Sequence, residues 1–307
     1  MSALAALHVR VDELGTATVA IRALAQSGRT QGAPAAPPAK PPALAAAEEA
    51  TRSWAAHVAE GWAQAAKIAE GWERVSSFSC GYVPIEVWRA ANGVRVVNVQ
   101  VEGPLVHSYI VIATECLSDN GLPHTLEHLV FLGSEDFPYK GVLDKVAFRN
   151  LATGTNAYTD VHHTAYTLST AGTEGTLALL PVFLDHVLYP TITDAGFVTE
   201  VYHVDGEGAE AGVVFSEMQA IENESGSLAY LALRKCLYPG ECGYAMETGG
   251  IMSGIRSLTV DQIREYHRTY YRPDNCFILV AGKVGTGELL SAGRIFLKRQ
   301  YCSMHTV

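Results

Sequence analysis

Residues 120–131 have the sequence NGLPHTLEHLVF. The stretch is typical of the start of a helix, because Asp119 and Asn120 can cap an N-terminus and proline is tolerated in a first helical turn. Its apolar residues supply a side for burial. On such a helix His124 and His128, four residues apart, leave the same face.

This spacing of histidines suits a metal ion. Two neutral imidazoles one turn apart can bind the same Zn²⁺, at about 2.0–2.1 Å each. Glu127 shares their face, so its carboxylate can take a proton from a bound water. The order H-x-x-E-H is the inverse of the zinc motif H-E-x-x-H. A purely structural role for the histidines in a packed helix remains an alternative at this point.

A third ligand is expected, because a hydrolytic zinc site usually has three protein ligands and leaves a fourth position to water. The acidic stretch 207–224 is the obvious source. Within it, the apolar flanks of Glu217 in GVVFSEM (212–218) predict a partly buried carboxylate that a cation would satisfy. Glu210, seven residues earlier, would lie two helical turns away on the same face and could orient a ligand. The pattern favours Glu217 as the ligand without excluding Glu210.

Composition narrows the class of protein. The net charge is −10 with only 22 Lys and Arg, which argues against nucleic-acid binding and makes basic peptides the easier partners. The six scattered cysteines indicate a reducing compartment, and no apolar run reaches the length of a membrane span. We therefore expect an intracellular protein. The cytoplasm is favoured, with the mitochondrion or chloroplast as alternatives because residues 14–47 contain no acid.

The sequence divides into four segments. Residues 1–50 are rich in Ala and Pro and predict a disordered extension. Residues 51–74, which contain two copies of an A-A-x-x-A-E-G-W pattern, predict a helix that continues to Trp72. Residues 75–285 have the length of one core, and residues 286–307 predict an irregular tail.

The pattern within 75–285 predicts an α+β fold, a mainly antiparallel sheet covered by helices. Alternating or wholly apolar runs indicate the strands, and amphipathic runs indicate the helices. Strands are expected at 83–88, 94–101, 108–114, 154–159, 165–169 and 276–281. Besides the helix of the opening stretch, helices are expected at 141–151, 176–188, 212–223, 228–237 and 260–270.

Several motifs together resemble one family. HTLEH at 124–128, FLGS at 131–134 and SEM at 216–218 are similar to the pitrilysin-type inverzincin metallopeptidases, the family of insulin-degrading enzyme and presequence protease. The similarity extends through TNAYT (155–159) and YYRPDN (270–275). It covers residues 80–285 and is greatest to the branch near presequence protease.

The resemblance implies a zinc-dependent endopeptidase with a LuxS/metallopeptidase-like fold. It implies that His124, His128 and Glu217 hold one zinc ion and that Glu127 is the general base. It also implies that Glu210 orients a ligand without binding the ion itself.

It also implies that Asn156 and Ala157 lie on an edge strand to which a peptide substrate adds as an extra strand. His162 and His163, in the turn that follows, are expected at the surface and not among the ligands.

Members of the family are longer, with two homologous halves that enclose the substrate. This chain resembles the first half only, so we expect a truncated chain or one that needs a C-terminal half or a second chain. Two functions are compatible with this expectation. One is a zinc endopeptidase acting on unfolded peptides, and the other is a non-catalytic half that binds zinc or peptide.

Overall fold

The computed structural model describes residues 8–11, 17–20, 71–238 and 240–298. Most of the expected extension and of the expected 51–74 helix lies outside these residues. The end of that helix is wrong, because Trp72 begins a strand and is buried in the core. Within the expected extension, β1 (His8–Val11) and β2 (Ala17–Ala20) pair as antiparallel strands, contrary to the expectation of disorder.

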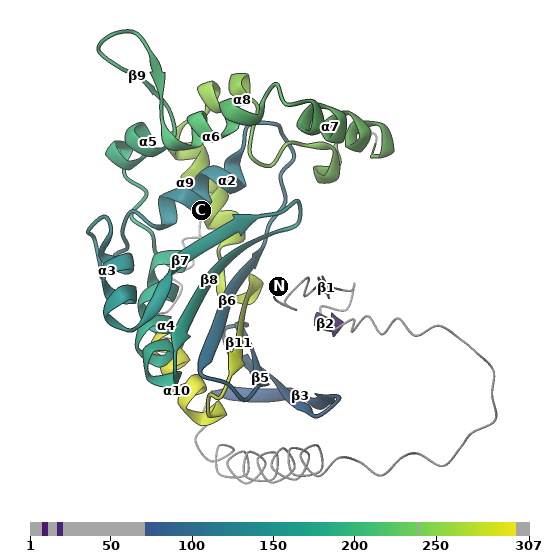
Figure 1. Cartoon of the computed structure of the whole chain (residues 1–307), viewed down its shortest axis with the longest axis vertical. Coiled ribbons are helices and arrows are strands. Elements are labelled where there is room, and N and C mark those ends of the chain that lie inside the picture. The colour runs from purple at the N-terminus through teal and green to yellow at the C-terminus, as the bar shows by residue number, and fades with distance from the viewer. Residues whose placement is uncertain (1–7, 12–16, 21–70, 239, 299–307) are drawn as a thin grey trace, which may run out of the picture.

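Seven strands form the main sheet, in the order β3-β4-β5-β11-β6-β8-β7 (Figure 1). All neighbouring strands are antiparallel except β5 and β11, which are parallel. The mixed α+β fold with a mainly antiparallel sheet is therefore confirmed. The strands are β3 (Trp72–Cys80), β4 (Val83–Ala90), β5 (Arg95–Gln100), β6 (Leu105–Ala113), β7 (Ala152–Thr159), β8 (His163–Ala171) and β11 (Cys276–Gly282).

The helices pack along one face and one end of this sheet (Figure 1). A further strand pair, β9 (His203–Val204) with β10 (Glu210–Ala211), projects beyond them. The helices are α2 (Leu122–Val130), α3 (Val142–Arg149), α4 (Thr173–Leu188), α5 (Asp194–Glu200), α6 (Val213–Ile221), α7 (Ser225–Leu237), α8 (Met252–Ser257), α9 (Val260–Tyr270) and α10 (Thr286–Lys298). No helix among the described residues has the length and apolar character needed to cross a membrane.

The core follows from alternation along the central strands. In β11, Ile278 and Val280 point into the main core, whereas Leu279 points to a small cluster on the other face of the sheet. In β6, Ile110 and Ile112 join the same main core. Side chains two residues apart share one face of a strand, so a single apolar run serves both clusters.

The tail differs from its prediction. Residues 286–298 form α10, and Leu289 and Leu290 are each 1% exposed, packed in the main core. The expected irregular tail is therefore wrong over these residues, because its leucines supply an apolar helical face. Residues 299–307 lie outside the described part of the chain. The short helices α5 and α8 and the β9–β10 pair also lacked a clear sequence pattern.

Candidate metal centre and cleft

Helix α2 begins through its backbone. Its N-cap is Gly121 with φ 77°, and not Asp119 or Asn120 as the sequence suggests. A Cβ at Gly121 would lie 2.5 Å from the carbonyl oxygen of Gly249, so only glycine fits this turn. The Asp119 carboxylate instead accepts a hydrogen bond from the backbone N–H of Glu247. This contact fixes the start of α2 against the loop that precedes α8.

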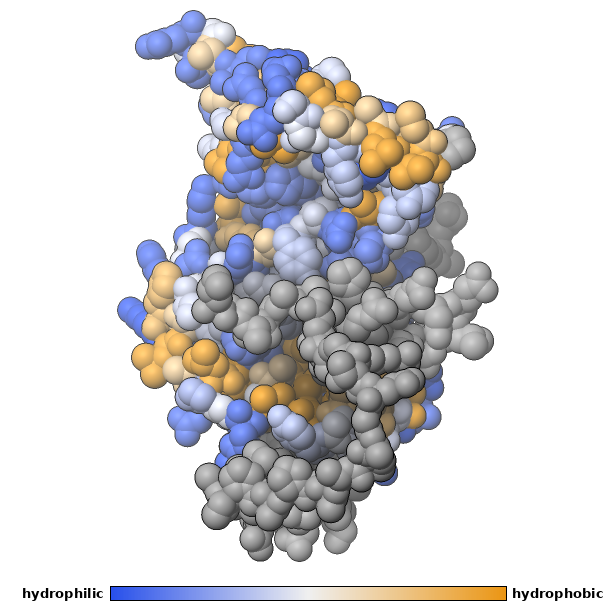
Figure 2. Space-filling model, turned by 45° about the vertical axis from the view of Figure 1, so that its right-hand side comes forward, coloured by the Kyte–Doolittle hydropathy of each residue, from blue (hydrophilic) through white to orange (hydrophobic). Residues whose placement is uncertain are grey.

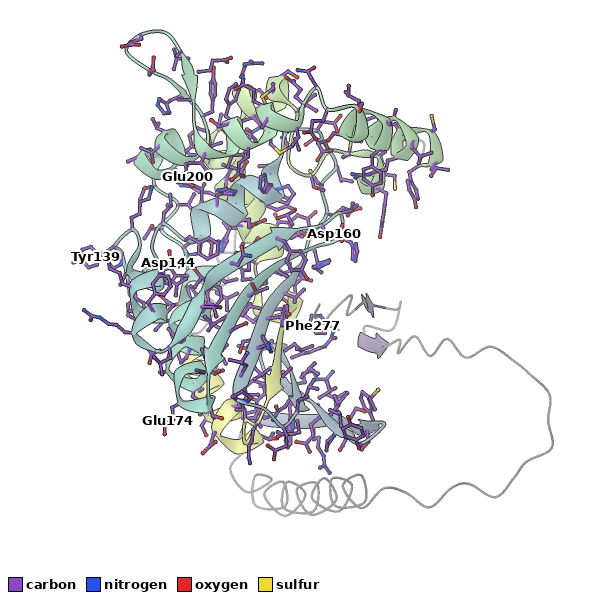
Figure 3. All side chains as sticks on the ribbon, viewed as in Figure 1. Tyr139, Asp144, Asp160, Glu174, Glu200 and Phe277 are labelled. Atoms are coloured by element: carbon purple, nitrogen blue, oxygen red, sulfur yellow. The ribbon has the colours of Figure 1, made fainter. Side chains whose placement is uncertain are left out.

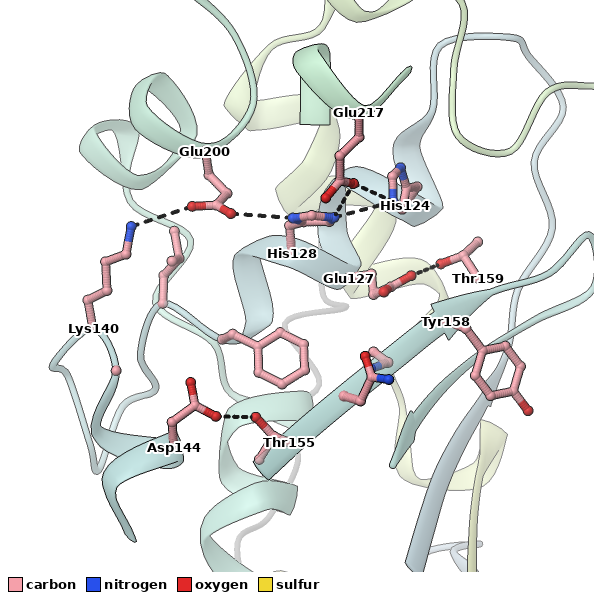
Figure 4. Close-up of a pocket in the computed structure, with 15 residues that line it drawn as sticks. His124, Glu127, His128, Lys140, Asp144, Thr155, Tyr158, Thr159, Glu200 and Glu217 are labelled. Atoms are coloured by element: carbon pink, nitrogen blue, oxygen red, sulfur yellow. Dashed lines mark hydrogen bonds and ion pairs between the residues drawn. The ribbon is translucent and has the colours of Figure 1, made fainter. Parts of the chain in front are cut away.

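The structure brings three of the predicted residues together at the cleft (Figure 4). The Nε2 atoms of His124 and His128 lie 3.3 Å apart. The Oε2 atom of Glu217, on α6, lies 3.6 Å from the first and 3.3 Å from the second. Ligands about 2.0–2.1 Å from a tetrahedral zinc ion lie roughly 3.3–3.5 Å from one another. The three donor atoms therefore fit a single ion.

The environment of Glu217 differs from the expectation. Val214, Phe215 and Met218 are buried as the apolar flanks suggested. The Glu217 side chain itself is 52% exposed and faces the cleft, so it is not a buried carboxylate in need of a counterion. Its convergence with the two imidazoles, and not its burial, makes it a candidate ligand.

Glu200, at the end of α5, contacts the other nitrogen of His128. Its Oε1 lies 3.3 Å from His128 Nδ1, and its Oε2 lies 3.4 Å from Nζ of Lys140. A carboxylate in this place orients a metal-binding imidazole. Glu200 was not predicted from the sequence, because no clear pattern indicated α5. The available signal was Thr193, whose side chain caps α5 by accepting a hydrogen bond from the Gly196 N–H.

Glu210 does not occupy this position. The prediction assumed a continuous helix from 210 to 217, but α6 begins only at Val213, after Gly212 with φ 134°. Glu210 lies on β10, where Nη2 of Arg256 donates to its Oε2 at 2.8 Å and the Tyr202 hydroxyl donates to its Oε1 at 2.9 Å. The hydrogen bond from Arg256 is the main reason that the pKa of Glu210 falls to about 2. The prediction that Glu210 orients a metal ligand is therefore wrong, because Glu210 contacts Arg256 and Tyr202 instead.

Glu127 is 8% exposed and lies beside the three donors. Burial raises its pKa, while a hydrogen bond from the Thr159 hydroxyl, at 2.5 Å from Oε2, lowers it in part. Burial also lowers the pKa of His124 to about 4, which leaves a neutral imidazole suited to bind a metal. Burial acts in the same sense on His128, but Glu200 and Glu217 outweigh it and raise the pKa of His128. The site thus places one imidazole with a lowered pKa and one with a raised pKa beside a buried carboxyl with a raised pKa.

A cleft of about 640 Å³ opens along the edge of the sheet beside these residues. Strand β7 is an edge strand, as the resemblance implied, because it pairs only with β8 in the main sheet. Asn156 and Ala157 line the cleft together with Glu127 and the three donors. One edge of β7 is therefore available to an added strand next to the candidate metal centre.

Comparison with known proteins identifies the domain that carries this centre. Residues 114–229 match the model described as insulinase, peptidase family M16, and this range includes all the residues at the centre. The chain carries an M16 peptidase domain. Residues 257–294 match a second model, described as the peptidase M16 inactive domain, so the M16 similarity reaches into α10.

Curated relatives of this M16 domain are longer proteins. An uncharacterized protein of Saccharomyces cerevisiae is 50% identical over 189 residues, 61% of this chain and 18% of the relative. The mitochondrial presequence protease of Xenopus laevis is 31% identical over 179 residues, 56% of this chain and 17% of that protein. The chain thus spans about a fifth of the length of the curated relatives it matches. A mitochondrial relative gives no support to the expected cytoplasmic location.

Solved structures share the fold of this M16 domain. A protease from Helicobacter pylori superposes with a TM-score of 0.59 at 22% identity, covering 69% of this chain and 49% of that one. Pitrilysin superposes with a TM-score of 0.58 at 17% identity, covering 73% of this chain and 24% of that one. These matches establish the architecture of the domain.

A second group of donor atoms lies in the turn between β7 and β8 of the M16 domain. Asp160 and His162 are exposed and His163 is partly buried. Their donor atoms lie within 4.8 Å of one another. The expectation that His162 and His163 lie at the surface agrees with this exposure for His162 and in part for His163.

Proposed function

We propose that this M16 domain is the zinc-binding catalytic part of a metalloendopeptidase that cleaves unfolded peptides. His124, His128 and Glu217 hold the zinc ion in this proposal. The observation that carries it is the mutual spacing of 3.3–3.6 Å among their donor atoms, next to a buried carboxyl group. One zinc ion per chain is expected.

The proposed chemistry divides between the metal and the side chains. When bound, zinc acidifies a water molecule and polarises the peptide carbonyl. Glu127 takes a proton from that water and delivers it to the leaving amine. The raised pKa of Glu127 suits this transfer, because a carboxyl with a pKa nearer neutrality both accepts and returns a proton readily. The Thr159 hydroxyl holds the carboxylate in place, and Glu200 orients His128.

The substrate would bind as an additional strand. Asn156 and Ala157 on the edge strand β7 offer backbone groups to an extended peptide, which brings its carbonyl beside Glu127. Only an unfolded segment has a backbone free for such pairing. This requirement supports unfolded peptides as the substrate class.

A second candidate function is a non-catalytic half that needs a homologous partner half. One comparison favours it: the match to the inactive-domain model at 257–294. Figure 2 shows apolar side chains over α7, where Leu228, Leu233 and Leu237 are all more than half exposed. Such a helix is suited to contact with another domain.

The test combines metal analysis with a cleavage assay. Wild-type protein should hold about one zinc per chain and cleave a quenched peptide, alone or after addition of a C-terminal half from a longer relative. Glu127→Gln should keep its zinc and lose cleavage, because the amide cannot accept the proton. Cleavage by Glu127→Gln would contradict the role of Glu127. Peptide binding without cleavage by wild type, under both conditions, would favour the non-catalytic function.

A further inference from the structure

The cleft carries more negative charge than the proposed chemistry uses. Its lining includes four carboxylates, and the single lysine among the lining residues is Lys140 (Figure 4). A cavity lined by one sign of charge concentrates groups of the opposite sign. The four carboxylates are those of Glu127, Asp144, Glu200 and Glu217.

Three of these carboxylates already have a role or a partner. In the proposed function Glu217 binds zinc and Glu127 transfers protons, while Glu200 pairs with the lysine. Asp144, on α3, is different. Its Oδ1 accepts a hydrogen bond from the Thr155 hydroxyl at 2.5 Å, and the ion pairs of the described residues give it no cationic partner. Its charge is therefore free to attract a cation that enters the cleft.

The position of Asp144 follows from alternation along β7. Thr155, Ala157 and Thr159 share one partly buried face of the strand, and the residues between them are exposed. At one end of this face Thr159 contacts Glu127, and at the other end Thr155 contacts Asp144. The two contacts are separated by four residues, or roughly 13–14 Å along the strand.

A peptide strand added to β7 alternates in the same way. Relative to the peptide residue beside Glu127, side chains two and four residues away point to the face where Asp144 lies. Phe131 and Leu132 line the same cleft and are partly buried. The aliphatic stem of a lysine or arginine can pack on such apolar groups while its charged end reaches a carboxylate.

We propose that Asp144 selects substrates that carry a lysine or arginine two or four residues from the peptide residue that lies beside Glu127 at the scissile bond. This inference rests on the proposed peptidase function and deepens it by naming a feature of the substrate. The net charge of −10 acts in the same direction over the whole molecule. Asp144 adds a positional requirement that the overall charge cannot supply.

The test scans one lysine through an otherwise neutral quenched peptide, with glutamine at the same position as reference. In the wild type, the ratio of kcat/KM for lysine over glutamine should rise about 1.4- to fivefold at the second or fourth position, the range measured for exposed ion pairs. It should stay near one at odd positions. Asp144→Asn should bring the ratio to about one, and Asp144→Lys should favour glutamate over glutamine. Because each ratio compares peptides within one protein, the amount of active protein cancels.

Glu174→Gln is the matched control. It removes one exposed carboxylate at the start of α4, away from both Asp144 and Glu200 in Figure 3, and should keep the wild-type ratio. A wild-type ratio near one at every position, or an unchanged ratio in Asp144→Asn, would overturn the inference while leaving the peptidase proposal intact. If no peptide is cleaved, either by the chain alone or after addition of a C-terminal half, the peptidase proposal fails. In that case the dissociation constants of the lysine and glutamine peptides are compared by fluorescence anisotropy on Glu127→Gln protein. Their ratio then decides the role of Asp144.

Discussion

A histidine that binds a metal through one ring nitrogen is oriented by the group that its other nitrogen contacts. For His128 that group is Glu200, whereas Glu210 is held away by Arg256. The two carboxylates differ by ten positions in the sequence, and only the fold distinguishes them. Replacing each by glutamine therefore distinguishes the position predicted from spacing from the contact that the structure contains.

We expect Glu200→Gln to weaken zinc binding by about 10- to 100-fold, the usual cost of losing such an orienting partner. Glu210→Gln should retain wild-type zinc affinity. Competition with a chromophoric chelator measures both. The reverse outcome, with zinc affinity lost only in Glu210→Gln, would restore the role predicted from spacing.

The pH dependence of cleavage should report on Glu127. The base works in its deprotonated form, so kcat/KM should rise with pH through its pKa, which burial raises above the usual carboxyl value. Thr159→Val removes a hydrogen bond that lowers this pKa, so the acidic limb of the profile should move to higher pH. Thr155→Val is the matched control, because its hydroxyl contacts Asp144 instead, and its acidic limb should stay in place. If the acidic limb of the Thr159→Val profile does not move, that limb does not report the ionisation of Glu127.

Among the secondary-structure elements, α10 differs most from its prediction, which was an irregular tail. Leu290 is 1% exposed, whereas its neighbour Ser291 is exposed. Leu290→Ala should lower the free energy of unfolding by about 2–5 kcal/mol through lost burial and a cavity. Ser291→Ala should change it by no more than about 0.5 kcal/mol. Denaturant unfolding measures both, and equal effects would mean that α10 does not belong to the folded core.

The elements that the sequence predicted well share a strong local signal. The helix of His124 and His128 has clear apolar periodicity, and the strand 276–281 is a wholly apolar run that is buried on both faces of the sheet. The part of the site that was missed depends on tertiary structure. Helix α5, which carries Glu200, has seven residues, none of them buried, so it offers no periodic pattern to detect. Spacing placed Glu210 on the helix of Glu217, but that helix begins only after Gly212, and Glu210 lies on β10.

At the scale of the whole molecule, the sequence predicted the class of fold but not the order of the strands. Strand β11 was expected to be buried because its residues are nearly all apolar. Its neighbours β5 and β6 are consecutive in the sequence, and only the structure shows that β11 lies between them. Local patterns specify that a strand is central, whereas pairing depends on contacts between residues far apart in the chain.

The insertion of β11 between β5 and β6 has a consequence for protein synthesis. As the chain leaves the ribosome, β3–β5 and β6–β8 can each pair within their own group, but they cannot join until residues 276–282 have been translated. Until then both groups present open backbone edges, which are sites for aggregation and for chaperone binding. Nascent chains that stop short of β11 should therefore depend most on chaperones.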